Sequence, residues 1–275
     1  MGRSQFLRSR GVAIATLFVA AFLFAACGEP ESLLVPEDSD EIFGEGGGGF
    51  GMTSSDPATF GAIKGRVVFE GKPYKAKTFT LSDKFCITAS PNGLKSEEFL
   101  YDADTKGIQG AMVYIQSGIK SFGDVPSEPV VLDQINCEYV PHLAVLRTGQ
   151  QLIIKSSDAT LHNVAGNAAA NGDKFNYTMN APMSLAPKVW NRPELDKPVK
   201  LKCDVHGWMS AFVAVLPHPF AAITAKDGSF ELKGVPPGKY RLLIWHEMLG
   251  ERKVEVTLTA NQELVVPATE STFTR

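Results

Sequence analysis

Short apolar stretches alternate with glycine- and proline-rich turns from residue 61 onward. Apolar and polar residues alternate at period two in residues 254–258, which is typical of a strand with one buried face. We expect further strands at 63–69, 112–115, 143–146, 152–154, 212–215, 222–224, 230–232 and 240–245. The turn at Gly149 predicts that its two flanking segments form a hairpin. Because no apolar repeat of helical period exceeds about two turns, the pattern predicts an all-β sandwich or barrel.

The first 26 residues have the pattern of an export signal. Three arginines precede an uncharged apolar run at residues 11–26, which is short for a membrane span. The run ends in two alanines before Cys27 and resembles the bacterial lipoprotein signal, although Phe24 stands where that family usually has leucine. The resemblance implies cleavage before Cys27, lipidation of its sulfur and export to the outer membrane, facing the periplasm or the cell surface. An ordinary secretory signal with a chance cysteine is the alternative.

Residues 27–60 lack apolar periodicity and are rich in acidic residues and glycine. We expect them to form a flexible tether that holds a folded head away from the membrane. Cleavage would remove three positive charges and no negative charge, so the formal net charge of the 275-residue chain would change from −3 to −6. The acidic balance argues against nucleic acid as a partner, and 44% hydrophobic residues argue against a mainly disordered chain.

A set of metal-ligating residue types follows the predicted strand at 152–154. His162 is followed 41 residues later by Cys203, and His206 and Met209 come directly after it in one short loop. A thiolate, two imidazoles and a weak thioether form a donor set that suits both Cu(I) and Cu(II). Zinc is the chemical rival, since it also binds cysteine and histidine, but methionine is a poor zinc ligand.

This set, with the segments around it, resembles the cupredoxins, the plastocyanin-like copper family, over residues 130–217. The resemblance implies a Greek-key sandwich holding one copper ion, with His162, Cys203 and His206 as equatorial ligands and Met209 as axial ligand. Only two residues separate His206 from Met209, where plastocyanin-like loops have four. The short end resembles the loop of cytochrome oxidase subunit II, whose dinuclear site needs a second cysteine that this loop lacks. By family analogy His206 is the electron port, and Trp208 supplies either apolar docking surface or simple core packing.

Cys86 and Cys137 are the remaining cysteines. In the oxidising compartment that export implies, two spare thiols usually pair, so we expect a disulfide between them. The alternative is a second metal site built from Cys137, His142 and His246.

A second resemblance brackets the copper segment. The glycine-rich strand pattern at 61–67 with residues 110–114 resembles the first half of a carboxypeptidase-regulatory-like domain, which has a transthyretin-like fold. Residues 227–230 and 235–240 resemble its second half, with Asp-Gly and Pro-Pro-Gly turns. The resemblance implies a sandwich formed by residues 61–120 plus 220–268, with the cupredoxin-like domain inserted between them. Three consecutive parts of one irregular β-protein are the alternative.

Three functions are compatible with these patterns. The first is a membrane-anchored copper protein that passes single electrons to an exported redox partner protein. The second is a copper-binding or copper-delivery lipoprotein without a redox partner, and the third is an extracellular adhesion or polysaccharide-binding module. An enzyme is not expected, because the chain has no nucleophile elbow, paired-carboxylate motif or phosphate-binding loop.

Overall fold

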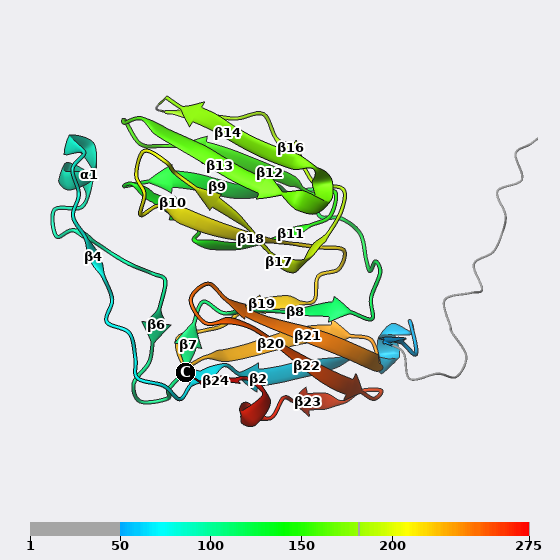
Figure 1. Ribbon diagram of the computed structural model, residues 1–275. Helices are drawn as coiled ribbons and strands as arrows, with labels where there is room; N and C mark the ends of the chain where they lie inside the picture. The colour runs from blue at the N-terminus through cyan, green and yellow to red at the C-terminus, as the bar shows by residue number, and fades with distance from the viewer. Residues whose placement is uncertain (1–49, 181, 275) are drawn as a thin grey trace, which may run out of the picture. The chain divides into compact units, whose positions relative to one another are not determined.

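The structure is a computed structural model that describes residues 50–180 and 182–274. The predicted signal at 1–26, the lipidation site Cys27 and the tether as far as residue 49 lie outside the described residues. The described chain is an all-β fold of sandwich-like sheets, as predicted (Figure 1). None of its helices is long and apolar enough to cross a membrane.

One set of strands, here called the carrier sandwich, combines segments from before residue 120 with segments from after residue 220. Its first sheet contains β1 (Gly51–Met52), β21 (Gly238–His246), β8 (Met112–Ser117), β19 (Ala221–Ile223) and β22 (Gly250–Leu258). Its second sheet has the order β20 (Ser229–Val235), β2 (Gly61–Arg66), β23 (Glu263–Val265). β3 (Val68–Phe69) pairs with β24 (Thr272–Phe273) beside them. β2 pairs with β20 and β8 pairs with β21, so these early strands pair directly with late ones.

The strands between residues 130 and 216 pair among themselves and are here called the inserted sandwich (Figure 1). One sheet contains β10 (Glu138–Val140), β9 (Val130–Ile135), β12 (Gln151–Ser156), β15 (Met183–Ser184) and β16 (Lys188–Val189). The other has the order β11 (Leu143–Arg147), β18 (Ser210–Leu216), β17 (Glu194–Lys202), β13 (His162–Ala168), β14 (Asp173–Met179). Alternating apolar residues such as Leu132, Ile154 and Val213 fill the core between them.

A long excursion, residues 70–107, leaves the carrier sandwich after β3 and returns before β8. It contains β4 (Thr78–Phe79), α1 (Lys84–Ala89), β5 (Leu94–Lys95) and β6 (Leu100–Tyr101), and β7 (Ile108–Gln109) follows it. α1 begins where the Asp83 carboxylate accepts a hydrogen bond from the backbone N–H of Cys86, a typical N-cap. This segment is here called the α1 excursion. Its middle part packs on the inserted sandwich, because Cys86 and Leu94 are buried in that core, whereas Phe99 is buried in the core of the carrier sandwich.

Two predictions about local structure are wrong. The segments at 143–146 and 152–154 do not form a hairpin, because β11 pairs in parallel with β18 and β12 pairs in parallel with β9. The turn at Gly149 instead crosses between the two sheets, with its backbone bonded to the Trp190 carbonyl. Residues 50–60 are not part of a flexible tether, since β1 pairs with β21 and η1 (Pro57–Thr59) follows it. Two further 3-10 turns are η2 (Ala169–Asn171) and η3 (Ala268–Glu270).

The two sandwiches meet through apolar and polar contacts. Tyr114 and Leu243 of the carrier sandwich share a buried cluster with Ala214 of the inserted sandwich. The guanidinium of Arg147 donates to the carbonyls of Phe122, Gly123 and Pro217, which lie in the two connecting segments. Both crossings between the sandwiches are therefore bound to one buried cation.

Candidate metal centre

The backbone around β13 and β17 brings the predicted ligands together. His162 begins β13, and Cys203 comes directly after β17, which pairs with β13. The loop from 203 to 209 is closed by two backbone hydrogen bonds, from Met209 to the His206 carbonyl (2.9 Å) and from Cys203 to the Met209 carbonyl (3.1 Å). The strands and this loop thus hold four residues, spread over 47 positions of the sequence, at one end of the inserted sandwich.

Three donor atoms converge in the buried interior of this loop. The Nδ1 atoms of His162 and His206 are 2.9 Å apart, and the Cys203 Sγ lies 3.9 Å from His162 Nδ1. All three ligand atoms lie within 4.8 Å of one another, and all three side chains are buried. An ion at the roughly 2.0–2.3 Å typical of bonds to imidazole nitrogen and thiolate sulfur can reach every one of them. The donor set therefore fits a metal ion with soft and borderline preferences, such as copper.

Met209 lies in the same turn and is buried in the core of the inserted sandwich. Its backbone hydrogen bonds tie it to both Cys203 and His206. The predicted axial residue is thus adjacent in the loop to the equatorial set, and its bond to a metal stays a prediction.

Asn163 fixes the start of the ligand loop. Its Oδ1 accepts hydrogen bonds from the backbone N–H groups of Asp204 (2.6 Å) and Val205 (3.2 Å). The N–H of His206 points at the Cys203 sulfur at 3.3 Å. The His206 N–H favours a thiolate over a thiol, because it places the positive end of a dipole at the sulfur.

Asp158 contacts the candidate site in a way that the sequence did not reveal. Its Oδ2 lies 2.9 Å from His162 Nε2, and its two oxygens accept from the backbone N–H groups of Asn136 (2.6 Å) and Cys137 (2.8 Å). Those two residues have positive φ angles of 54° and 64°, so the carboxylate stabilises a turn that few residues adopt readily. With Nε2 bonded to Asp158, Nδ1 of His162 is the nitrogen left to hold a metal. The sequence offered one signal for this contact: an acidic residue, Asp158, lies just after a predicted strand and four positions before His162.

The charges of the cluster respond to these contacts. Burial lowers the pKa of His162, but its hydrogen bonds with Asp158 and Cys203, which act as acceptors, outweigh it and raise that pKa to about 9. Burial raises the pKa of Cys203, but the hydrogen bond with His162 and the surrounding N–H groups outweigh it and bring that pKa below its usual value. Burial and the charge of His162 lower the pKa of His206. These contacts therefore shift the cluster toward the thiolate form of Cys203 and the charged form of His162, and away from the charged form of His206.

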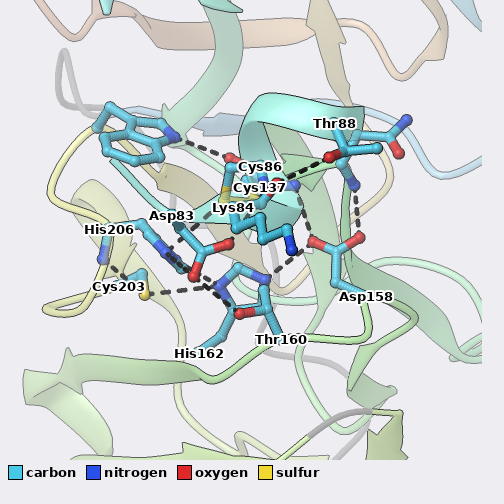
Figure 2. The surroundings of a disulfide bond; sticks show 12 residues. Asp83, Lys84, Cys86, Thr88, Cys137, Asp158, Thr160, His162, Cys203 and His206 are labelled. Atoms are coloured by element: carbon cyan, nitrogen blue, oxygen red, sulfur yellow. Dashed lines mark hydrogen bonds and ion pairs between the residues drawn. A yellow bond between two sulfur atoms is a disulfide. The ribbon is translucent and has the colours of Figure 1, made fainter. Parts of the chain in front are cut away.

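The disulfide between Cys86 and Cys137 is formed, as predicted, with Cα atoms 5.6 Å apart. It lies against the metal-ligand cluster, because Cys86 Sγ is 3.7 Å from His206 Nε2 (Figure 2). Asp83 Oδ2, at the start of α1, lies 3.9 Å from the same nitrogen. Pairing of Cys86 with Cys137 also leaves no free Cys137 thiol for the alternative metal site with His142 and His246. His142 bonds instead to the Ser210 carbonyl and to Glu247.

His206, the predicted electron port, is buried, and its role in electron transfer stays a prediction. Only 3% of its surface is exposed, because α1 and the disulfide cover the edge of the ring that faces away from His162. Trp208 is half-buried, donates its Nε1 hydrogen to the Cys137 carbonyl (3.0 Å) and stacks on Phe79. The indole therefore packs against the α1 excursion, and any docking role for it stays a prediction.

No protein-family model matches the sequence, and no curated protein matches it either. Similar solved structures include a purple cupredoxin from Nitrosopumilus maritimus, at 16% identity, with 31% of this chain and 98% of that chain covered and a TM-score of 0.27. An oxidised mutant of amicyanin has 19% identity, with 38% of this chain and 97% of that chain covered and a TM-score of 0.28. A Cu-containing nitrite reductase from Thermus scotoductus SA-01 has 12% identity, covers 36% of this chain and has a TM-score of 0.29, and the match spans only 24% of the reductase. At these TM-scores the similarities are too partial to assign a function.

Proposed function

We propose that the inserted sandwich holds one copper ion and passes single electrons to an exported redox partner protein. His162, Cys203 and His206 supply the equatorial donors, and Met209 supplies a weak axial thioether. When bound, copper supplies the one-electron couple. The chain is a carrier rather than an enzyme, and its lipid anchor at Cys27 keeps it at the membrane.

The observation that carries the proposal is the convergence of two Nδ1 atoms and one sulfur within 4.8 Å in a buried position. One thiolate with two imidazoles is a trigonal set that tolerates both oxidation states of copper, so little rearrangement accompanies electron transfer. The hydrogen bonds to Asp158 and Asn163 fix the first ligand and the ligand loop before any metal arrives. Burial under the α1 excursion keeps solvent from the donors and favours retention of the ion over its release, which supports a carrier of electrons rather than of copper.

The carrier sandwich is proposed to be the carboxypeptidase-regulatory-like domain, formed by residues 61–120 plus 220–268. The direct pairing of β2 with β20 and of β8 with β21 supports this assignment, because a split domain requires early and late strands to share sheets. Its role in the proposal is mechanical: it supplies the α1 excursion.

The test is a visible absorption spectrum of the full mature protein after addition of one equivalent of Cu(II). A thiolate bonded to Cu(II) gives an intense visible charge-transfer band, and Cys203→Ser should abolish that band. His162→Asn should abolish or shift it, whereas the matched change His142→Asn, outside the cluster, should leave it in place. Protein that binds copper without colour, with Cys203 reduced, refutes the proposal. Protein that binds zinc and rejects copper identifies a structural zinc site instead.

The anchor is tested separately, by mass spectrometry of the mature N-terminus. Lipid on Cys27 supports the proposed location, and an unmodified terminus at another residue rejects it. A Cys27→Ala precursor should remain uncleaved by the lipoprotein peptidase.

A further inference from the structure

His206 has metal-ligating neighbours on both edges of its ring. Its Nδ1 faces His162, whereas its Nε2 faces Cys86 Sγ at 3.7 Å (Figure 2). The ligand atoms of Cys86, Cys137 and His206 all lie within 4.8 Å of one another, the same limit that the set around Cys203 meets, and all are buried. One imidazole therefore separates a single cysteine from a pair of cysteines.

We propose that reduction of the Cys86–Cys137 disulfide creates a second metal site, in which both thiolates and His206 Nε2 bind Cu(I). This site shares only His206 with the electron-transfer site and does not depend on copper being bound at Cys203. Two thiolates with one imidazole form a soft donor set, which selects Cu(I) over the hard cations that prefer oxygen ligands.

The chemistry needs an external dithiol as reductant. Thiol–disulfide exchange breaks the bond between the Cys86 and Cys137 sulfurs and forms a disulfide in the reductant, so two electrons and two protons enter the chain. Binding of Cu(I) then displaces the two thiol protons, and no electron moves in that step. The proposal requires the reduced sulfurs to separate to non-bonded contact within the core.

The shared imidazole couples the two sites. A neutral imidazole has one lone pair, on either Nδ1 or Nε2, so His206 binds strongly to one ion at a time. An ion bound by Cys86, Cys137 and His206 Nε2 is separated from Cys203 by the imidazole ring of His206. The second site is therefore a buried Cu(I) site beside the proposed electron-transfer site, on the other edge of His206.

Asp83 and α1 cover the Nε2 edge of His206, where the proposed second ion would bind. The Asp83 carboxylate is 3.9 Å from His206 Nε2 and caps the short helix that carries Cys86. The hydrogen bond from Thr160 to Asp83 holds the helix start against the inserted sandwich. Once the disulfide is open, this contact, the packing of Phe79 on Trp208 and the burial of Leu94 in the core of the inserted sandwich still hold the α1 excursion over His206.

The experiment uses full mature Cys203→Ser protein, which lacks the first thiolate, in a disulfide form and in a dithiol form. Both are titrated anaerobically with Cu(I) in competition with a chromophoric chelator. The dithiol form should bind one equivalent of Cu(I), at least about tenfold more tightly than the disulfide form, which corresponds to about 1.4 kcal/mol. X-ray absorption of the loaded dithiol form should show two sulfur ligands and one imidazole nitrogen.

Replacement of His206 distinguishes a site that needs the imidazole from Cu(I) binding by the two free thiolates alone. His206→Asn in the Cys203→Ser background should weaken Cu(I) binding and remove the imidazole signal, whereas His142→Asn should change neither. Equal binding by the disulfide and dithiol forms overturns the proposal, as does Cu(I) binding that is insensitive to His206→Asn. These outcomes are independent of the visible band that tests the electron-transfer site, because that band is measured with Cu(II), intact Cys203 and the disulfide closed.

Discussion

The disulfide should contribute a large part of the stability of the inserted sandwich. Cys86 and Cys137 are separated by 51 positions, and both are completely buried in its core. Closing a loop of this length lowers the entropy of the unfolded chain by an amount worth about 4 kcal/mol in the chain-entropy model. The Cα spacing of 5.6 Å lies in the ordinary range for disulfides, so the backbone imposes no obvious penalty against that gain. The double variant Cys86→Ala/Cys137→Ala should therefore lose about 4 kcal/mol in free energy of unfolding.

The assay is equilibrium denaturation by guanidinium chloride, followed by tryptophan fluorescence in metal-free protein. Reduced wild-type protein should match the double variant, because both lack the cross-link. Cys203→Ala is the matched control, since it removes a buried sulfur but no cross-link. A loss below about 1 kcal/mol in the double variant refutes the reasoning and means that the unfolded chain already holds residues 86 and 137 close together.

Three further substitutions test one contact of the candidate metal site and two contacts elsewhere in the fold. Asp158→Ala should weaken copper binding about 10–100-fold, because it removes the carboxylate that orients His162, and chelator competition measures this. Burial lowers the pKa of His142, but Glu247 outweighs it and raises that pKa, so this pair contributes stability that is present below the ordinary histidine pKa and lost as pH rises through the raised one. Glu247→Gln should therefore reduce the free energy of unfolding near about pH 5.5 and change it little near about pH 9, as denaturation at the two pH values will show. Arg147→Met should cost about 1.5–3 kcal/mol in the same assay, because the buried carbonyls of both connections lose a charged donor.

The ligand cluster could be predicted from sequence because its chemistry is concentrated in few residues. Cys203, His206 and Met209 share one loop, and only His162 had to be found at a distance. The strand class was also readable, since period-two alternation and turn residues reflect local backbone preferences. The pairing of Cys86 with Cys137 followed from counting thiols in an oxidising compartment.

What surrounds the cluster was not predictable, because it depends on contacts between distant segments. Residues 143–154 read as a hairpin, since a glycine turn between two apolar segments looks the same whether the strands pair or separate into two sheets. Asp158 gave no distinctive signal, because its partners on the turn at 136–137 are 22 and 21 positions away. The electron-port role of His206 was assigned by analogy, and the analogy contained no segment equivalent to the α1 excursion, which buries this side chain.

The α1 excursion changes how the proposed copper site must exchange electrons. It leaves the carrier sandwich, crosses to the inserted sandwich and places Cys86 against the edge of His206 that would otherwise meet a partner. Because that edge is covered, an electron leaving through His206 passes into residues 83–89 or the disulfide before it reaches the surface. Ile87 on α1, Leu161 before His162 and Val205 in the ligand loop are each about half exposed, at 48%, 47% and 48%. Exposed apolar residues near the site therefore come from the α1 excursion as well as from the inserted sandwich, so we expect a partner that docks on the proposed copper site to contact both.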